Sequence, residues 1–377
     1  MQISLSEEQS LLRESVARFV ANEYAFDKRQ ALSAGTLGFS EAHWLMFAEL
    51  GWLGLPLPEA DGGLDMGPAE VALLMAEFGR GLVQTPYLAT VLLGARLLAA
   101  LGTPAQRGEI LPAVIAGKYK LTLAHTEAGS RDPVGDVAAT AAHTGSGYRL
   151  DGIKSWVPWG AAADTVVVSA RLDGRLALFL LGASMPGLDW HHFISHDGGR
   201  ASTLRLDGVR VGSDRLLGDP TVAEAVLAQV VDGAIAALCA EAGAAIAAVQ
   251  EKTVTYLKTR EQFGRPLSSL QALQHRLVDL YVMRELAQSA ALDATLAAAE
   301  QDPIQRAIGV SAAKHRLGEL GRAAGKEGVQ LHGGIGMAWD YEIGHYLKRL
   351  VAIDLSFGDS RFHLDRYRRL ALGGGAA

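Results

Sequence analysis

The sequence predicts a mainly helical protein with a β domain in the middle of the chain. Long apolar runs at helical spacing occupy residues 1–118 and 220–377, whereas runs of strand length occupy residues 119–219. Apolar residues make up 49% of the 377 residues, which is enough for a large core. We therefore expect an N-terminal helical domain (1–118), a middle β-sandwich or β-barrel (119–219) and a C-terminal four-helix bundle (220–377).

The N-terminal segment begins with a helix-start signal. Ser6 and Gln9 have the spacing of a capping box, in which each side chain bonds the backbone of the other residue. Apolar residues then recur at helical spacing as far as Val20. Further helical runs are expected at 41–51, 67–79, 86–101 and 104–116.

The middle segment contains short strand patterns and turn signals. Residues 148–157 predict a strand, a turn and a strand, and residues 165–169 and 176–181 are apolar runs of strand length. Asp207 and Gly208 form a dipeptide typical of hairpins. Because no helical pattern separates these runs, we expect antiparallel pairing.

The C-terminal segment predicts four long helices, at 221–260, 267–299, 303–330 and 340–370. The most apolar stretch, 223–249, is interrupted by Gln229, Asp232 and Glu241. We therefore expect a buried helix there and no membrane span.

The amino-acid composition argues against several classes of function. The net charge is −6 and no basic stripe is visible, which argues against nucleic acid as the main partner. Cys239 is the only cysteine, so a disulfide framework is excluded and a reducing, cytoplasmic compartment is expected. The spacing of His191, His192 and His196 does not match a metal-ligand pattern, and we expect no metal site.

One stretch, Thr259–Gln274, combines an arginine with a helix start. Arg260 ends a long apolar run, a Phe-Gly-Arg-Pro turn follows at 263–266, and Ser268 is the expected N-cap of the next helix, which exposes Gln271 and Gln274. Guanidinium and free backbone N–H groups together suit a diphosphate. The alternative is a helical hairpin with a solvated arginine.

A second cluster, Gln-Leu-His-Gly-Gly-Ile-Gly, occupies residues 330–336. It is not a dinucleotide-binding fingerprint of the strand–turn–helix kind, because a helical run precedes it. Gly333, Gly334 and Gly336 permit close approach of another backbone or a ligand, and Gln330 has the chemistry to bind an adenine or ribose edge. The alternative is a helix C-cap with a tight turn.

These two motifs, in this order, resemble the acyl-CoA dehydrogenase family. The resemblance also covers LSEEQSLLRESVARFV at the N-terminus, YRLDGIKSWV in mid-chain and RASTLRLDGVRVGSDRLLGD, and thus nearly the whole chain. Its helix–β–helix fold agrees with the order of elements expected above. The segments VVDGAIAALCAEA, VGDVAATA and YLKRLVAIDLSFGD are similar to the branch that contains the small subunit of pimeloyl-CoA dehydrogenase.

The resemblance implies FAD as the cofactor. In the family, the arginine of the Arg-x-x-Phe-Gly motif binds the FAD diphosphate of a neighbouring subunit, and the glutamine–glycine cluster closes on the adenosine half. The matching residues here are Arg260, Phe263, Gln271, Gln330, Gly333 and Gly334. Because these contacts cross between subunits, the resemblance also implies a dimer or a dimer of dimers.

The resemblance places the flavin ring beside the middle segment. Thr126, Glu127 and Ser130 match the family loop, and Trp156 matches a residue that covers the flavin face. This chain departs from the family pattern in the Gly-Ser-Arg-Asp run at 129–132. It also has Pro158 where relatives carry a threonine hydroxyl near the reactive flavin nitrogen, and Trp159 where they carry asparagine. Proline supplies neither a hydroxyl nor an N–H.

The expected catalytic base is missing. Relatives abstract the proton alpha to the thioester with a glutamate from one of two places, which match Phe357 and Ala234 here. A neighbouring substrate-site arginine is replaced by Ile235, whereas Asp232 matches a residue that contacts the pantetheine arm. Two other acids remain as candidates.

Glu241 lies seven residues after Ala234 on one helix face, so it is a candidate base; the alternative is a buried ion pair. Asp359 follows the altered loop, where a solvated position or a ribose contact is the alternative to catalysis.

Four hypotheses follow. The leading one is an FAD-dependent subunit of a heteromeric acyl-CoA dehydrogenase whose companion chain supplies the glutamate. The others are a homomeric dehydrogenase that uses Glu241, a structural subunit without flavin, and a flavoenzyme with a different reaction on an acyl thioester. The family implies an acyl-CoA substrate and an electron-transfer flavoprotein as acceptor, and the branch resemblance implies a dicarboxylic or bulky acyl chain.

Overall fold

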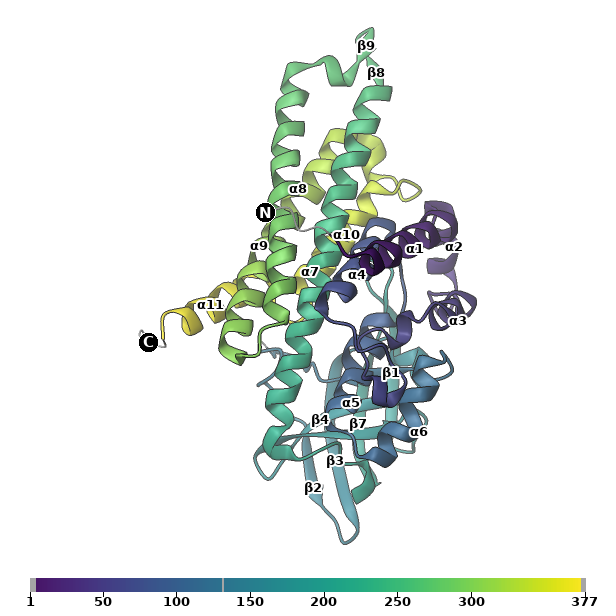
Figure 1. The fold of residues 1–377 in the computed structure, drawn as a ribbon, viewed down its shortest axis with the longest axis vertical. Helices are drawn as coiled ribbons and strands as arrows, with labels where there is room; N and C mark the ends of the chain where they lie inside the picture. The colour runs from purple at the N-terminus through teal and green to yellow at the C-terminus, as the bar shows by residue number, and fades with distance from the viewer. Residues whose placement is uncertain (1–4, 131, 374–377) are drawn as a thin grey trace. The chain divides into compact units, whose positions relative to one another are not determined.

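A computed structural model describes residues 5–130 and 132–373. The described elements follow the expected order of helices, strands and helices, and contacts group them into two compact units. The first unit comprises the chain up to Gln30, Pro68–Val83 and the chain from Ile235 onward. The second comprises Ala31–Gly67 and Gln84–Ala234. This grouping assigns parts of the N-terminal helical segment to each unit, and each unit is described below by itself (Figure 1).

The first unit is helical. Its members are α1 (Glu7–Glu23), α4 (Pro68–Gly81), most of α7 (Pro220–Thr259), α8 (Gln271–Ala298), α9 (Pro303–His332), α10 (Ile343–Leu355), α11 (Ser360–Ala371) and the hairpin strands β8 (Glu261–Gln262) and β9 (Arg265–Pro266). Helix α2 (Phe26–Ala34) crosses from one unit to the other. The expected capping box is confirmed, because Gln9 N donates to Ser6 Oγ and Ser6 N donates to Gln9 Oε1.

The fourth bundle helix is not continuous, contrary to the expectation of one run over 340–370. Helix α10 ends at Leu355 and α11 begins at Ser360. Between them, Phe357 and Gly358 have φ values of 56° and 93°, which a right-handed helix does not accommodate. The Asp359 side chain caps α11 by accepting a bond from Phe362 N, so this acid has a structural role.

The second unit is built on one curled sheet with helices α3 (Glu41–Glu49), α5 (Arg96–Leu101) and α6 (Pro104–Ile115) and the π-helix η3 (Leu88–Ala95). Its strands are β1 (Leu121–Ala124), β2 (Thr140–His143), β3 (Gly147–Pro158), β4 (Thr165–Leu172), β5 (Arg175–Gly182), β6 (Leu188–Ile194) and β7 (Arg200–Gly212). The order is β1-β4-β2-β3-β7-β6, with β5 also on β4. Two of the pairings, β1 with β4 and β2 with β4, are parallel, which the sequence pattern did not indicate.

The two Asp-Gly dipeptides lie opposite each other at one β-bulge and are not turns. Strands β3 and β7 run through Asp151-Gly152 and Asp207-Gly208 and pair along most of their length, with a register shift between Leu150 and Gly152. Gly208 N donates to Asp151 Oδ1 at 2.9 Å, and Gly208 has a φ of 61°. The turn signal therefore marked a local irregularity that twists a long antiparallel pair.

Helix α7 is the longest element and the centre of the first unit. By length and hydropathy it is the one described helix that could span a membrane, but 61% of its most apolar window is buried inside the protein. Gly243 packs it against Ala291 of α8, and Gly328 of α9 packs against Val249. Figure 1 shows α7 and α8 side by side as far as the β8–β9 hairpin.

Helix α4 crosses α7 at very close range within the first unit. A Cβ added at Gly79 would lie 2.1 Å from the carbonyl oxygen of Glu241, so only glycine fits this crossing. We expect Gly79→Ala to lower the free energy of unfolding by about 1–3 kcal/mol, because the helices would have to separate.

Gly108 of α6 provides the matched control for this substitution. No atom lies within 4 Å of a Cβ added there, so Gly108→Ala should stabilise the helix by about 0.5–1 kcal/mol. Denaturant unfolding of both variants measures the two effects. Equal stability of Gly79→Ala and the wild type would show that the close crossing is wrong.

Candidate active site

The end of α7 carries the first group of expected site residues. Arg260 follows the helix, and the hairpin β8–β9 then turns through Phe263 and Gly264, as the Phe-Gly-Arg-Pro pattern predicted. Phe263 has a φ of 54° and is 86% exposed. A large aromatic ring held out in this way has its apolar surface free for a neighbouring molecule.

The expected N-cap at Ser268 is wrong. Residues Leu267–Ser269 form a 3-10 turn, and α8 begins at Gln271 with Leu270 as its N-cap and no side-chain cap. Gln274 instead uses its side-chain amide to donate to Ser268 O. The first-turn N–H groups of α8 therefore have no competing side-chain acceptor in the part of the chain described.

The glutamine–glycine cluster lies where α9 ends. Gly333 is the C-cap of α9 with a φ of 64°, so the helix end and tight turn considered as the alternative are present. An added Cβ at Gly333 or Gly334 meets nothing within 4 Å, whereas at Gly336 it would lie 2.6 Å from Val329 O. The backbone at Gly333 and Gly334 is thus accessible to a ligand, whereas Gly336 allows the chain to pack closely against Val329.

The donor chemistry of this unit fits a dinucleotide. The side chains of Arg260, Gln271 and Gln330 are exposed, and none makes a hydrogen bond or ion pair with the residues described. A guanidinium offers a planar fork of donors for a diphosphate, and carboxamides suit ribose and adenine edges. With the open backbone at Gly333 and Gly334, this donor set is appropriate for FAD.

The second group of expected residues lies in the second unit. Thr126 and Trp156 pair as an isolated bridge, and Ser155 N donates to Thr126 O at 2.9 Å. Both bridge residues are exposed, Trp156 at 42%, and its ring packs edge-on against Phe193. The structure therefore brings these two predicted flavin contacts together at the surface of the sheet.

The carboxylate of Glu127 forms hydrogen bonds within the second unit. It accepts bonds from Lys154 Nζ at 2.6 Å and from the backbone N–H groups of Ala138 and Ala139. It thereby joins the two ends of the loop that contains Ser130, whose hydroxyl donates to Asp132 O. The Glu127 side chain holds this loop closed and is not free for a ligand. The altered residue 131 lies outside the described part.

Lys154 is fully buried and anchors this clamp from β3. Its ammonium group donates to Glu127, to Ser169 Oγ at 3.0 Å and to His125 O. Burial lowers the pKa of Lys154, and the bond to Glu127 opposes that shift. Burial raises the pKa of Glu127, but the bonds from Lys154 and the backbone outweigh it, so the net change is downward.

His125 completes this buried cluster, and sequence reasoning did not identify it. Its Nδ1 lies 2.8 Å from Ser169 Oγ, and its Nε2 is buried. Burial, with the nearby Lys154 charge, lowers the pKa of His125 to about 4. The unfolded chain therefore binds a proton at this residue between about pH 6.5 and pH 4, and the folded chain does not.

We expect this difference to make stability depend on pH. The contribution of His125 is complete above about pH 6.5 and is lost as the pH falls to 4, at a cost of about 3 kcal/mol. Denaturant unfolding across this range should show a shallower slope for His125→Gln. The same change at exposed His143 is the control, and an unchanged slope in His125→Gln would contradict the assignment.

The next positions of β3 depart from the family pattern as the sequence indicated. The carbonyl of Pro158 accepts a bond from Thr122 Oγ1, which ties β3 to β1. Trp159 has a φ of 56°, a conformation that asparagine adopts easily and tryptophan rarely does. Its ring packs edge-on against Phe39, and this contact holds it in place.

Neither expected position of the catalytic base offers an acid. Ala234 is fully buried in α7, and Phe357 occupies the α10–α11 loop. Within the first unit, Glu241 is 2% exposed and makes a bidentate ion pair with Arg349, with Nε–Oε1 at 2.5 Å and Nη2–Oε2 at 2.8 Å. The structure thus favours the paired alternative for Glu241. Asp232 is also buried.

The α10–α11 loop is held from several sides. Lys314 Nζ donates to the carbonyls of Ile353, Asp354 and Gly358, and His363 bonds Phe357 O. Burial lowers the pKa of Lys314 to about 8 and that of His363 to about 3. These bonds fix Phe357 in its left-handed conformation, and the sequence alone gave no sign of them.

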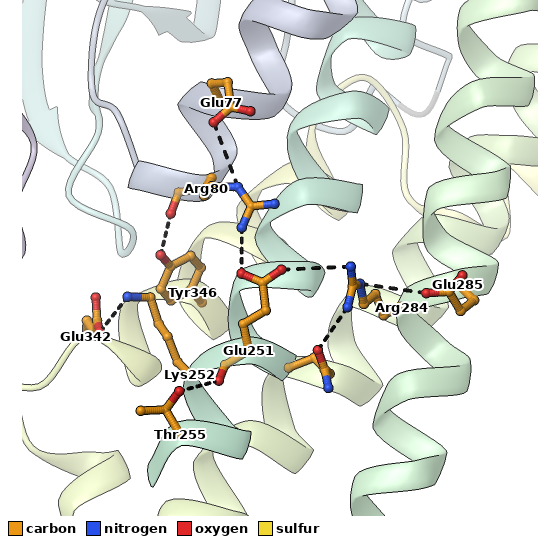
Figure 2. A network of polar contacts seen from close by, with 10 residues as sticks. Glu77, Arg80, Glu251, Lys252, Thr255, Arg284, Glu285, Glu342 and Tyr346 are labelled. Atoms are coloured by element: carbon orange, nitrogen blue, oxygen red, sulfur yellow. Dashed lines mark hydrogen bonds and ion pairs between the residues drawn. The ribbon is translucent and has the colours of Figure 1, made fainter. Parts of the chain in front are cut away.

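A polar network within the first unit surrounds a cavity of about 550 Å³. Figure 2 shows Arg80 of α4 bonded to Glu251 of α7, and Lys252 bonded to Glu342. The N–O distance of each bond is 2.7 Å. Tyr346 donates to Arg80 O. The four charged side chains that line the cavity are therefore paired with one another. The network joins α4, α7 and the start of α10.

The histidines of β6 have ordinary sheet contacts. His192 Nδ1 lies 2.7 Å from Ser202 Oγ, and His191 packs near Phe193. Among residues 5–130 and 132–373, no group of three histidine, cysteine or acidic residues is placed to hold a metal ion.

Comparison with known proteins decides the family. The acyl-CoA dehydrogenase N-terminal domain model matches residues 6–118, and the acyl-CoA dehydrogenase C-terminal domain model matches residues 225–371. IpdE2, an acyl-CoA dehydrogenase of Mycobacterium tuberculosis, is 32% identical over 91% of this chain and 91% of its own. The chain belongs to the acyl-CoA dehydrogenase family. The family's enzymes are FAD-dependent oxidoreductases that act on CH–CH groups.

Other relatives match this chain along nearly its full length. The probable acyl-CoA dehydrogenase YngJ of Bacillus subtilis is 29% identical over 96% of this chain and 97% of its own. A solved variant of the Tcur3481-Tcur3483 steroid ACAD has a TM-score of 0.89 at 33% identity, covering 99% of this chain and 100% of its own. The ChsE4-ChsE5 complex of M. tuberculosis has a TM-score of 0.89 at 28% identity, with both chains fully covered.

Proposed function

We propose that this chain is the FAD-binding subunit of a heteromeric acyl-CoA dehydrogenase whose companion chain supplies the catalytic base. One observation carries the proposal: the two positions at which relatives place a glutamate hold Ala234 and Phe357. The candidate base on α7, Glu241, is already paired with Arg349. Two structural neighbours support a heteromer, because their names describe a two-component steroid ACAD and a two-protein complex.

The residues of this chain divide into three tasks. Arg260, Gln271 and Gln330, with the backbone at Gly333 and Gly334, bind the diphosphate and adenosine of FAD, and Phe263 packs beside them. Thr126 and Trp156 face the flavin ring, and the Glu127–Lys154 pair closes the loop around Ser130. Asp232 contacts the pantetheine arm of the acyl-CoA. Bound FAD supplies the hydride acceptor for the β carbon of the substrate.

Two features of the chain bear on the chemistry. Pro158 removes a hydroxyl donor from the flavin side of the sheet, so any hydrogen bond to the ring there must come from another group. A companion acid would take the α proton, as general-base catalysis requires. We also propose an electron-transfer flavoprotein as acceptor, a cytoplasmic location and a dimeric or tetrameric assembly. The pimeloyl-CoA dehydrogenase small-subunit branch stays a prediction.

The alternative of a homomeric enzyme requires the ion pair between Glu241 and Arg349 to break. Glu241 would act as base only after Arg349 released its carboxylate, which leaves an unpaired buried charge at a cost of about 3–5 kcal/mol. The exposed donor set argues against the alternative of a structural subunit without flavin. Arg260, Gln271 and Gln330 make no hydrogen bonds with the described residues, so their donors are available to a ligand, which a purely structural subunit does not need.

Co-purification tests the heteromer. The chain should be expressed alone and together with the acyl-CoA dehydrogenase homologue encoded beside it, and acyl-CoA oxidation should be followed with an artificial electron acceptor. We expect turnover only from the co-purified complex, because the proton acceptor is in the companion. Full turnover by this chain alone would rule the proposal out.

Removal of the Arg260 charge tests the cofactor site. In the co-purified complex, Arg260→Ala should weaken FAD binding by about 10- to 100-fold, the loss expected for a charge-assisted pair of bonds. Flavin absorbance after dialysis gives the retained fraction. Arg265→Ala, an exposed arginine of the same hairpin, is the matched control. Equal flavin retention in the two variants would remove Arg260 from the site.

A further inference from the structure

The glycine segment, Gly333–Met337, is a single 3-10 turn between α9 and α10 in the first unit. Its backbone is accessible at Gly333 and Gly334, where an added Cβ would meet nothing within 4 Å. Glycine has more backbone conformations to lose on ordering than any other residue. Backbone N–H groups bind a ligand tightly only when they are already held in place. The residues on either side of the glycine segment therefore determine how well it can bind.

His332 holds the glycine segment at the end of α9. It is the last residue of that helix, is 3% exposed, and its Nδ1 lies 2.8 Å from Gly328 O. Its ring stacks on Tyr256 of α7, with the ring centroids 4.4 Å apart and an interplanar angle of 25°. Its Nε2 is buried without a hydrogen-bond partner in the described part of the chain. The stack on Tyr256, and not a bond at Nε2, therefore fixes this face of the ring.

Tyr341 and Glu342 hold the chain just before α10. The ring centroid of Tyr341 lies 5.4 Å from that of His332 and 6.5 Å from that of Tyr256. Glu342 Oε1 accepts a bond from Lys252 Nζ at 2.7 Å. Because Lys252 and Tyr256 are four residues apart in α7, they lie on the same face of that helix. One face of α7 thus contacts the chain on both sides of the glycine segment.

Trp339 is held by other parts of the first unit. Its carbonyl accepts a bond from Gln30 Nε2 at 2.7 Å and lies 2.9 Å from His345 Nε2. Helix α7 is therefore not the only element that holds residues 333–342. We expect the loss of one α7 contact to loosen this loop without unfolding the unit.

The cavity of about 550 Å³ adjoins these contacts, and its lining includes Tyr256, Tyr341, Lys252 and Glu342. A cavity offers no packing atoms to replace the contacts of a shortened ring. Figure 2 shows a second ion pair at the same cavity, between Arg80 and Glu251. That pair joins α4 to α7, and neither of its residues belongs to the loop 333–342. It therefore provides a matched control.

We propose that Tyr256 and Lys252 are positioning residues for the cofactor, because they hold the glycine segment in one conformation before FAD binds. This inference rests on the proposed function, since it takes Gly333 and Gly334 as contacts of the adenosine half of FAD. Tyr256 acts through its stack on His332, and Lys252 acts through Glu342. A segment that is already ordered loses less conformational entropy when the ligand binds.

Hydrogen exchange of the flavin-free chain tests the first step. We expect Tyr256→Leu to speed amide exchange in peptides that cover residues 333–342 by about 2- to 10-fold, the loss expected for one aromatic pair. Tyr256→Phe keeps the ring and should exchange like the wild type. Unchanged exchange in Tyr256→Leu would show that the stack does not hold the loop.

The affinity of the co-purified complex for FAD tests the second step, with fluorescence quenching of added FAD as the measurement. We expect Tyr256→Leu to raise the dissociation constant of FAD by about 2- to 10-fold, and Lys252→Met by about 2- to 5-fold. Arg80→Met removes an ion pair of the same 2.7 Å length at the same cavity and should leave the affinity unchanged. An equal loss in Arg80→Met would indicate a general effect of the cavity wall and would overturn the proposal.

The Arg260→Ala variant separates the two ways in which the experiment can fail. If the wild-type complex binds no FAD, the proposed function fails. If Arg260→Ala weakens FAD binding but Tyr256→Leu and Lys252→Met do not, only the positioning role fails. Lys252 is partly exposed, so Lys252→Met is expected to fold even if Tyr256→Leu does not, and its FAD affinity then decides the question.

Discussion

The ion pair between Glu241 and Arg349 determines what this chain can and cannot do. It uses two parallel bonds to bury the carboxylate of Glu241, the candidate base seven residues after Ala234, in a region where an unpaired charge would be very costly. The same helix carries Ala234, the crossing with Gly79 and, at its end, Arg260. This chain therefore offers hydrogen-bond donors for a cofactor, but the carboxylate of Glu241 is already bonded to Arg349 and is not available as a base.

Local sequence signals predicted most of the fold because they act within a few residues. The Ser6 capping box and the apolar spacing of the long helices are of this kind. The predictions were wrong where contacts between residues far apart in the sequence determine the structure. Asp151-Gly152 and Asp207-Gly208 have turn chemistry, yet they face each other at one bulge, since β3 and β7 gain more from continuous pairing than from two hairpins. The break after Leu355 likewise depends on Lys314, which lies 41 residues earlier in the chain.

In the candidate site, too, local features were predicted from the sequence and contacts between distant residues were not. Motif spacing identified Arg260, Gln330 and the open glycines, because exposure and donor chemistry are properties of the residues themselves. The role of Glu127 was missed, because its partner Lys154 becomes visible only when β3 is placed next to the loop.

The central claim, that the proton acceptor comes from another chain, is tested most directly by hydrogen exchange at the α carbon. A 3-thia acyl-CoA can be incubated in D₂O with the FAD-loaded chain alone and with the complex, and deuterium uptake followed by mass spectrometry. The account predicts uptake only with the complex, because deprotonation needs a free carboxylate near the thioester. Rapid uptake with this chain alone would contradict it.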